Sequence, residues 1–475
     1  MQTSENRVLA MHPDLALLEN ENRREIRCLL IRDVPDAQVD ALAGYGAFCV
    51  YRQGNLAALL YDKDGCKDEQ ALREAVLASG IQAGVSGPFA LAASARGCMA
   101  KARLALETGL LVNPGQAIYP MDEYGEAALL GAVKQALLEQ EFIAEDFCDA
   151  SLMQMAHMDA LRDTQYVQSL HAYLKCGMDM KTAAKELGVH RNTLSYRLER
   201  AAALFDLDLK DGSRCFELLF SLWLAEKLQG ETAQHDEALP FDVQAAQGAL
   251  WSHVERGGQE QTGIGAFGCA LLCVDVSRLA DAERAALIAR VRACMPKESA
   301  LAYDEDVLLC AVAPECLSLL AERVKPVCAA SSCRVVRSQA FPGGRLAQHA
   351  RLCRMALCAA GGMEVHTRDL CSTLLFMAVE CSVSLAPYVS EEVIRVMDDD
   401  AQKGTALSRS LYAYLLHFSD MKLAAAQLGM HRNTMEYHLR KIDALIGADK
   451  ARDRRFMMMC TYKMLALPEI RRYGL

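Results

Sequence analysis

The stretch ELGVHRNTLSYRLERAAALF, residues 186–205, returns as QLGMHRNTMEYHLRKIDALI, residues 427–446. The segment that begins at Ser169 aligns without gaps with the one that begins at Ser410, and about half of the positions are identical. His190 pairs with His431 at an offset of 241 residues. Agreement over such a length indicates an internal duplication, which decides how the rest of the chain is divided.

Each copy has the pattern of two helices joined by a tight turn. In the first copy the small residues Ala183 and Ala184 precede Gly188, and glycine tolerates the left-handed geometry in which many helices end. The apolar stripe of the second helix has helical spacing and consists of Leu194, Leu198, Ala201 and Phe205. A short helix, a turn with glycine and a second helix with a polar start predict a helix-turn-helix.

The polar start of the second helix carries side chains suited to DNA. In the major groove an Arg can bond O6 and N7 of guanine, and an Asn can bond adenine. Backbone N–H groups and a Thr hydroxyl at a helix start can hold a phosphate. An alternative stays open, in which Asn192 or Thr193 merely caps the helix and Tyr196 packs against a neighbouring helix. Arg191 has no capping role, so a DNA contact is the better interpretation for it.

The balance of charge is acidic overall and basic near the duplicated segments. The formal net charge of −10 excludes a uniformly basic coat that binds nucleic acid through its whole surface. From Lys181 to Arg214 there are seven Lys and Arg against five Asp and Glu, and from Lys422 to Arg455 there are eight against four. A solvated surface could also show this modest excess, so the motif supports DNA binding more strongly than the charge does.

The duplication extends upstream. RCLLIRDV, from Arg27, matches CALLCVDV, from Cys269, and both predict a short buried strand. A helix, a strand hairpin, a helix, a strand and a further helix follow in each half, and this order predicts a small α+β domain. In the first half these elements are residues 36–46, 48–62, 69–80, 81–86 and 92–109, and in the second half residues 281–295, 300–313, 317–331, 333–339 and 345–362.

The pattern AAKELGVHRNTLSYRLERAAALF, residues 183–205, resembles the C-terminal helix-turn-helix of the PucR family of bacterial transcription regulators, which includes the CdaR-type sugar-diacid regulators. It is similar, more distantly, to the Fis-type DNA-binding helix-turn-helix. The upstream segment, with GVSGPF before a long helix rich in Ala and Arg, resembles the degenerate GGDEF-like domain of this family. The expected fold class is therefore α+β, with two repeats of a small degenerate GGDEF-like domain followed by an all-α helix-turn-helix bundle.

This organisation divides the chain into five parts. We expect an α+β domain at residues 1–140, a helix-turn-helix domain at 141–232, a linker at 233–264, a second α+β domain at 265–382 and a second helix-turn-helix domain at 383–475. The stretch GETAQHDEALPFDVQAAQG, from Gly230, is polar, contains a proline and lacks apolar periodicity, so it is the expected joint between the halves.

The resemblance implies a set of DNA-binding residues in each copy. Base edges would be approached by His190, Arg191 and Asn192 and by His431, Arg432 and Asn433. Phosphates would be near Thr193, Tyr196 and Arg197 and near Thr434, Tyr437 and His438, with Arg200 and Lys441 on the same polar face. The second copy departs from the pattern at Glu436 and His438, where the first has Ser195 and Arg197. The two copies are therefore expected to differ in affinity or in preferred sequence.

The doubled architecture suggests a single-chain pseudo-dimer. Helix-turn-helix proteins commonly bind as dimers to half-sites about 34 Å apart, and a fused duplicate would supply both DNA-binding parts from one chain. We expect a sequence-specific transcription regulator whose partner is double-stranded DNA. A small-molecule effector and a homodimer stay open as further partners. The N-terminus lacks a signal-peptide pattern and no apolar run of about 18 residues occurs, which predicts a cytoplasmic protein with no membrane partner.

Two other classes of function are alternatives to DNA binding. Nucleotide cyclisation by a GGDEF-like domain needs a Gly pair and acidic residues at the central hairpin, whereas the turns read YRQGNLA and YDEDVLL, the latter with Asp304, Glu305 and Asp306. The other class is a scaffold in which the helix-turn-helix units serve dimerisation without DNA. We expect no enzyme activity and no cofactor.

Other chemical signals in the sequence are weak. GIGAFG, residues 263–268, precedes a predicted strand, whereas a dinucleotide fingerprint follows one. The 19 cysteines never form a C-x-x-C pair, and His157, His349 and His366 lack ligand spacing. Buried reduced thiols and no metal site are the expected outcome.

Overall fold

The computed structural model describes residues 26–47, 49–62, 69–87, 94–228, 242–256, 268–359, 361–447 and 450–467. The chain forms two compact units. Unit 1 comprises Met1–Gln135 together with Val379–Leu475, and unit 2 comprises Ala136–Ala378. The units therefore differ from the two sequence repeats, because each unit joins the α+β domain of one repeat to the helix-turn-helix bundle of the other.

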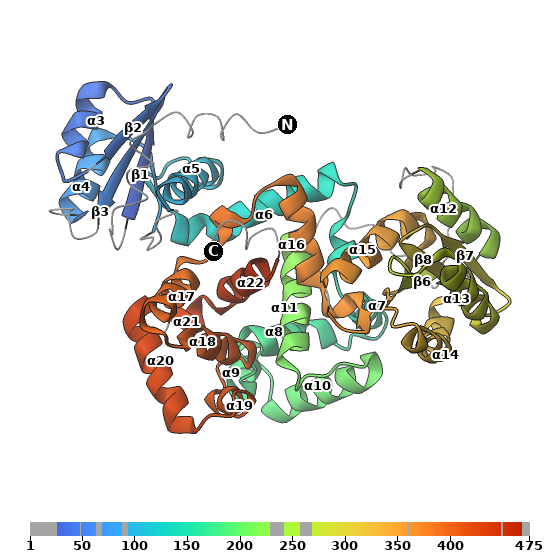
Figure 1. Ribbon diagram of the computed structural model, residues 1–475. Helices are drawn as coiled ribbons and strands as arrows, with labels where there is room; N and C mark the ends of the chain where they lie inside the picture. The colour runs from blue at the N-terminus through green and yellow to red at the C-terminus, as the bar shows by residue number, and fades with distance from the viewer. Residues whose placement is uncertain are drawn as a thin grey trace. The chain divides into compact units, whose positions relative to one another are not determined.

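The α+β domain of unit 1 is built on a sheet with the strand order β2-β3-β1-β4-β5. Its strands are β1 (Ile26–Arg32), β2 (Cys49–Gln53), β3 (Leu56–Asp62), β4 (Ala83–Val85) and β5 (Ile118–Pro120). Alternate side chains of β1 point to opposite faces. Leu29 and Ile31 pack with α3 (Asp36–Ala43) and α4 (Glu69–Ser79), whereas Cys28 and Leu30 pack with α5 (Ser94–Val112). Helices thus cover both faces of this sheet (Figure 1).

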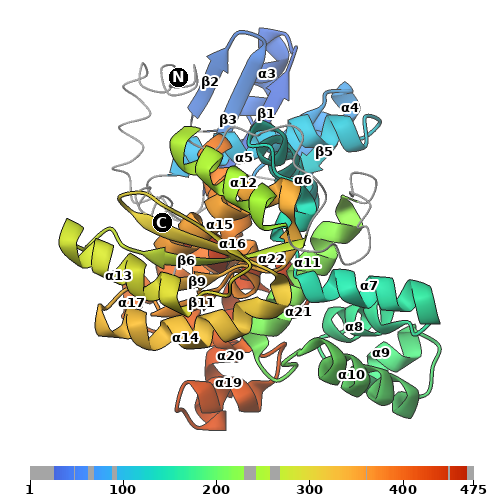
Figure 2. The ribbon, with the colours of Figure 1, turned by 90° about the vertical axis from the view of Figure 1, so that its right-hand side faces the viewer.

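The α+β domain of unit 2 repeats this topology in the strand order β7-β8-β6-β9-β11, and β10 also pairs with β6. Its strands are β6 (Gly268–Asp275), β7 (Ser299–Tyr303), β8 (Val307–Val312), β9 (Val335–Arg337), β10 (Phe341–Pro342) and β11 (Glu364–His366). The helices around it are α12 (Val243–Arg256), α13 (Asp281–Cys294), α14 (Leu317–Ala330) and α15 (Leu346–Ala359) (Figure 2). Three short 3₁₀ helices accompany them, namely η2 (Pro314–Cys316), η3 (Gly343–Arg345) and η4 (Thr367–Asp369).

One hydrogen bond shows that the two sheets correspond in detail. The Cys28 N–H donates to Ser86 Oγ at 2.9 Å in unit 1. The Leu271 N–H donates to Ser338 Oγ at 2.7 Å in unit 2. A serine thus accepts from the backbone of the central strand in both sheets, in keeping with their common strand order.

The two helical bundles share one order of elements, except that the bundle of unit 1 has the additional short helix α21. In unit 2 it is η1 (Ala144–Phe147), α7 (Ala150–Arg162), α8 (Tyr166–Lys175), α9 (Met180–Glu186), α10 (Arg191–Phe205) and α11 (Gly212–Lys227). In unit 1 it is η5 (Ala386–Tyr388), α17 (Glu391–Lys403), α18 (Leu407–Leu416), α19 (Met421–Gln427), α20 (Arg432–Ile446), α21 (Lys450–Asp453) and α22 (Arg455–Leu465). The chain reaches these bundles through α6 (Met121–Glu139) and α16 (Cys371–Ser382).

A partly buried carboxylate cap also recurs at the duplication offset. Asp159 accepts hydrogen bonds from the N–H groups of Tyr166 at 2.8 Å and Val167 at 2.9 Å. Asp400 accepts from Leu407 and Ser408, both at 2.7 Å. Each carboxylate satisfies donors that the first turn of a helix leaves unpaired and links that turn to the end of the preceding helix.

Three elements differ from the expectation. The strands β5 and β11 have three residues each, too few for a periodic pattern to reveal them. The expected linker at 233–264 contains the helix α12, whose buried side chains Ala246, Ala249, Leu250 and His253 have helical spacing. The remainder of the expected linker lies outside the described residues.

The cysteines of the described residues are free thiols, and most of them are buried. Burial raises the pKa of Cys98 to about 12, which keeps this thiol protonated and inert. The prediction of buried reduced thiols is confirmed for this part of the chain. None of the described helices has the length and apolar character needed to span a bilayer.

Candidate nucleic-acid interface

The turn between the two helices of each motif depends on a glycine in the left-handed region. Gly188 has a φ of +65° and Gly429 a φ of +63°. The Gly188 N–H donates to the Lys185 carbonyl at 3.2 Å and the Val189 N–H to the Ala184 carbonyl at 3.0 Å, a Schellman motif. The same two bonds recur at Gly429 and Met430. This turn sets the direction in which α10 and α20, the reading helices, leave the motif.

Each reading helix begins with a histidine cap. His190 has extended backbone angles, and its Nδ1 accepts a hydrogen bond from the Asn192 N–H at 3.2 Å. His431 makes the same bond to the Asn433 N–H at 3.2 Å. Since Nδ1 is the acceptor, the ring proton of each neutral histidine lies on Nε2, which remains a donor. The alternative in which Asn192 or Thr193 caps the helix is therefore wrong, because His190, two residues before Asn192 and three before Thr193, performs this role.

The side chains at the start of each reading helix lie on the surface. Arg191, Asn192 and Thr193 are exposed, as are their counterparts in the second copy, Arg432, Asn433 and Thr434. Tyr196 is 64% exposed and Tyr437 55%, which is unusual for aromatic side chains of this size and argues against packing on a neighbouring helix. Both arginines can therefore be reached by a duplex.

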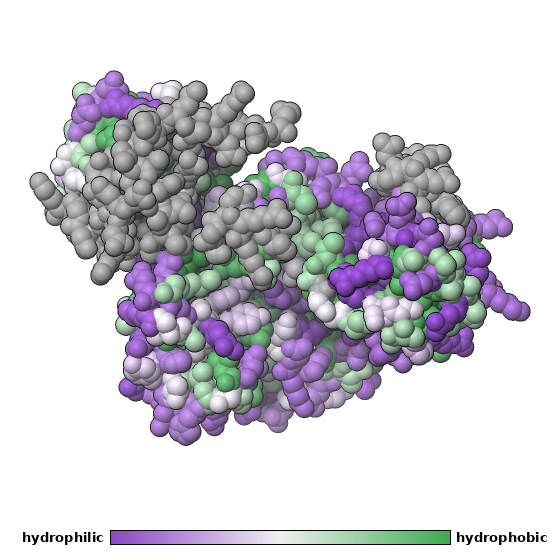
Figure 3. Space-filling model, viewed as in Figure 1, coloured by the Kyte–Doolittle hydropathy of each residue, from purple (hydrophilic) through white to green (hydrophobic). Residues whose placement is uncertain are grey.

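The opposite face of each reading helix forms the core of its motif. Leu194, Leu198 and Ala201 are buried as predicted, and Phe205 stacks edge-on against Tyr166 at 6.2 Å between ring centroids. In the second copy Met435 packs with Ala424 and Ala425. Figure 3 shows hydrophilic residues on the outer side of α20, which lies at the lower left in Figure 1.

The other predicted residues differ between the copies. Arg197 is partly buried and Arg200 is exposed. His438, in the place of Arg197, is partly buried, and its Nδ1 lies 2.7 Å from Ser410 Oγ on α18. Lys441 Nζ lies 4.6 Å from the ring centroid of Tyr437, a cation–π geometry. The second reading helix thus holds two of its basic groups against other side chains of the same bundle.

The position that follows the predicted contact residues also differs. Ser195 donates to Glu199 Oε1 at 2.8 Å in the first copy. In the second copy Arg440 donates to Glu436 Oε1 at 2.6 Å, which neutralises the carboxylate that distinguishes this helix. Glu436 therefore presents an ion pair to a ligand rather than an isolated negative charge.

All of the predicted contact residues lie on the second helix of each motif or at its cap. Lys181 and Lys422 occupy the same position in the first turn of α9 and α19, and both side chains are exposed. The first helix of a helix-turn-helix crosses the phosphate backbone, so a lysine at this place suits a phosphate contact. Their occurrence at the same offset as the histidines was the signal that could have identified them.

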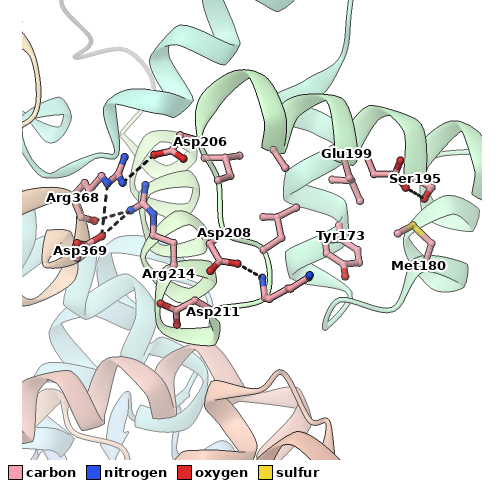
Figure 4. Close-up of a pocket in the computed structure, with 15 residues that line it drawn as sticks. Tyr173, Met180, Ser195, Glu199, Asp206, Asp208, Asp211, Arg214, Arg368 and Asp369 are labelled. Atoms are coloured by element: carbon pink, nitrogen blue, oxygen red, sulfur yellow. Dashed lines mark hydrogen bonds and ion pairs between the residues drawn. The ribbon is translucent and has the colours of Figure 1, made fainter. Parts of the chain in front are cut away.

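A groove of about 750 Å³ lies behind the first reading helix, within unit 2 (Figure 4). Arg368 Nη2 from η4 lies 3.4 Å from Oδ2 of Asp206, the residue that ends α10. Arg214 Nη1 donates to the Arg368 carbonyl at 2.9 Å and forms a buried ion pair with Asp149. The C-terminal end of α10 is thereby attached to the second α+β domain.

The acidic turn singled out in the second half of the sequence makes contacts within its own domain. Asp304 Oδ1 accepts from the N–H groups of Asp306 and Val307, both at 2.8 Å, and Oδ2 accepts from Arg354 at 2.5 Å. These bonds lower the pKa of Asp304 against the effect of its burial, and they occupy its carboxylate in the turn. No cluster of three or more potential metal ligands occurs in the part of the chain that the structure describes. Most of GIGAFG lies outside that part.

The three histidines singled out in the sequence have structural environments. His349 is buried and stacks on Phe341 at 4.0 Å between ring centroids. His366 Nδ1 accepts from the Arg368 N–H at 3.2 Å, and burial together with nearby arginines lowers its pKa to about 3. His157 is exposed on α7.

Comparison with known proteins agrees with the geometry of these motifs. The PucR C-terminal helix-turn-helix domain matches the chain twice, at residues 166–224 and 407–460. A DNA-binding transcriptional activator, AdeR of Bacillus subtilis, is 30% identical over 74 residues, which are 16% of this chain and 18% of that protein. The proline-responsive transcriptional activator PutR of Bacillus subtilis is 27% identical over 105 residues, 22% of this chain and 25% of that protein.

The similarity to these curated relatives thus spans a quarter of their length or less. Among solved structures, a regulator of polyketide synthase expression from Bifidobacterium adolescentis matches 50% of this chain and 96% of that chain, with 16% identity and a TM-score of 0.24. A score this low does not establish a common fold for the α+β domains.

Proposed function

We propose that this chain is a cytoplasmic, sequence-specific DNA-binding transcription regulator that acts without catalysis. The observation that supports it most strongly is the pair of reading helices, each with a histidine cap and an exposed Arg-Asn-Thr start. The two matches to a DNA-binding domain and the similarity to two transcriptional activators support the same function. His190, Arg191 and Asn192 and their counterparts would contact base edges, and the remaining predicted residues would lie near phosphates.

The two reading helices of one chain act as a pseudo-dimer on paired half-sites. A duplicated reader gives one chain the two recognition elements that other helix-turn-helix proteins obtain by dimerisation. The two half-sites should lie about 34 Å apart, one helical turn, or a multiple of that distance. A footprint with two half-sites for each bound chain is expected, and a footprint with a single half-site for each chain would contradict the pseudo-dimer.

The half-sites should differ in sequence. The first reading helix offers Arg197 where the second holds His438 against Ser410, and the second adds the Glu436–Arg440 ion pair. Fewer free basic groups on α20 imply a smaller electrostatic contribution to binding from the second copy. The α+β domains would then serve as degenerate GGDEF-like modules that hold the bundles, an assignment supported by the use of Asp304 within its own turn.

Loss of binding on removal of both arginines tests the function. Genomic fragments bound by the purified chain would be sequenced, and the recovered site would be used to measure the affinity of Arg191→Ala/Arg432→Ala. Each base contact contributes about 1–3 kcal/mol, so the double variant should bind ~30-fold or more weakly. Its thermal unfolding should stay close to that of the parent, because both side chains are exposed.

A matched control uses arginines of the same two bundles outside the reading helices. Arg162 on α7 and Arg409 on α18 are exposed, so Arg162→Ala/Arg409→Ala removes the same charge and should retain affinity within a few fold. If Arg191→Ala/Arg432→Ala binds DNA as the parent does, the reading helices are not the DNA-binding surface and this proposal is refuted. If no genomic fragment is retained, the scaffold function without DNA binding takes its place.

A further inference from the structure

Both helix-turn-helix bundles contact an α+β domain through the same loop. In unit 2 the loop follows η1 and begins at Cys148, and in unit 1 it follows η5 and begins at Val389, 241 residues later. The loop is fixed in the same way in both, since the Asp149 N–H donates to Ser221 Oγ at 3.1 Å and the Ser390 N–H to Thr461 Oγ1 at 2.8 Å. Each loop therefore presents an equivalent carbonyl to its α+β domain.

The contact in unit 1 is a buried ion pair between the two repeats. Lys101 of α5 donates to the Val389 carbonyl at 2.9 Å, and its Nζ lies 3.4 Å from Glu391 Oε1. The side chain of Lys101 is 2% exposed and that of Glu391 9%. Gly87 leaves room for the carboxylate, because a Cβ at this position would lie 1.7 Å from Glu391 Oε2. The first α+β domain is thus shaped to receive an acidic residue here.

The contact in unit 2 uses different chemistry at the equivalent place. The Gln339 amide donates to the Cys148 carbonyl at 2.8 Å and accepts from the Ala150 N–H. Beside it, Asp146 forms an ion pair with Arg345, and its Oδ1 lies 3.4 Å from His349 Nε2. Where the second bundle has Glu391 the first has Ala150, and where the first has Asp146 the second has Pro387.

We propose that these two buried contact sets select the pairing of the modules, so that each helix-turn-helix bundle takes the α+β domain of the other repeat as its partner. The opposite pairing would set Lys101 against Ala150, which has no carboxylate, and would set Arg345 against Pro387. A lysine buried without an acidic partner is strongly unfavourable, because its charge loses hydration without compensation. The selection concerns recognition within the chain and is independent of DNA binding.

Cleavage between the repeats tests the crossed pairing. A protease site inserted into the full chain at residues 233–240 allows cleavage into an N-terminal and a C-terminal fragment. Each unit contains parts of both fragments, so the cleaved protein should elute as one complex with the size of the intact chain. Separation of the fragments under native conditions would overturn the proposal.

Re-pairing of the cleaved protein tests the role of the buried contacts. The complex would be dissociated in mild urea and diluted, and native mass spectrometry would count mixed pairs and pairs of like fragments. The parent should return almost entirely to mixed pairs. Lys101→Gln, which leaves Glu391 buried without its cation, should lower the equilibrium constant for mixed pairing by ~100-fold. A statistical mixture from the parent, or an unchanged preference in this variant, would overturn the proposal.

The double variant Lys101→Gln/Glu391→Ala guards against simple misfolding. It removes both charges of the buried ion pair and leaves a neutral amide near an alanine. These residue types also meet at this contact in unit 2, where Gln339 bonds the loop from a different position, so a folded complex is expected. Its thermal stability should recover relative to Lys101→Gln, while its fragments should form more pairs of like fragments than the parent. Recovery of stability together with full retention of mixed pairing would show that other contacts select the partner.

Discussion

The histidine cap of the first reading helix has two separable functions, and substitution of His190 should distinguish them. In the structure Nδ1 accepts from the Asn192 N–H at 3.2 Å, while Nε2 carries the proton. His190→Ala removes both groups. His190→Asn retains an acceptor for the cap but offers no donor at the place of Nε2. Asparagine is among the preferred residues at this helix position, so it should replace the cap fully.

The magnitude follows from the geometry. A single exposed cap bond at this length corresponds to the lower part of the usual range, about 0.5–1 kcal/mol. In a unit of this size that is a fall of about 2 °C in Tm for His190→Ala, with none for His190→Asn. Loss of the proposed hydrogen bond from Nε2 to a base edge costs about 1.5 kcal/mol, so both variants should bind DNA ~10-fold more weakly.

The assay is the salt dependence of DNA binding, measured beside thermal unfolding. A neutral donor releases no counterions, so both His190 variants should keep the slope of log Kd against log salt. Arg191→Ala should reduce the magnitude of that slope by about one if the arginine neutralises a phosphate, and leave it unchanged if it reads a base. Unfolding of His190→Asn at the temperature of His190→Ala would refute the cap, and parental affinity of His190→Asn would refute the Nε2 contact.

Three further predictions concern the stability of the units. Gly429→Ala should destabilise unit 1 by about 1 kcal/mol, because alanine is strained at a φ of +63°. Gly131 is exposed within α6, so Gly131→Ala should stabilise unit 1 by about 0.5–1 kcal/mol. Chemical denaturation measures the free energy of unfolding of both variants. Burial raises the pKa of Asp398 from 3.8 to about 6. The folded state therefore binds more protons than the unfolded state between these values, and the free energy of unfolding falls as pH rises from about 4 to 6. Asp398→Asn should remove this pH dependence and add about 1 kcal/mol at pH 7, after allowance for partial solvent screening. Arg214→Ala leaves the buried Asp149 without its cation and should destabilise unit 2 by about 3–5 kcal/mol. The control Arg200→Ala, at an exposed position, should change the free energy of unfolding by less than about 0.5 kcal/mol. A fall in Tm of equal size in both variants would contradict the buried ion pair.

The fold of each module could be predicted from the sequence because its signals are local. The stripe from Leu194 to Phe205, the turn at Gly188 and the buried strands all depend on patterns within about twenty residues. The histidine caps could not be predicted from residue preferences, which favour Ser, Thr, Asp and Asn at that position. The ion pair between Lys101 and Glu391 joins residues that are far apart in the chain, and no local pattern marks such a pair.

The composition of the two units could not be predicted for the same reason. Both halves contain the same modules in the same order, so the sequence is equally compatible with pairing inside a repeat and pairing between repeats. The choice depends on a few buried side chains at the contact, such as Gln339 and Asp146. Because the first bundle and the second α+β domain belong to one unit, the end of α10 lies beside η4. No pattern in the first half of the sequence indicates this contact.

The places where the two repeats agree and differ follow a physical division. Positions that satisfy backbone donors agree in chemistry, as at the caps His190 and His431 and the carboxylates Asp159 and Asp400. These positions must offer an acceptor in both copies, since an unpaired backbone donor is costly wherever the helix is used. Positions that face a partner differ, as at Ala150 and Glu391. A duplicated chain uses the same backbone arrangement in both repeats, but the two bundles must not exchange their α+β domains. The buried charges at the contacts between bundle and α+β domain distinguish the two partners, because a charge buried without its counterpart is strongly unfavourable.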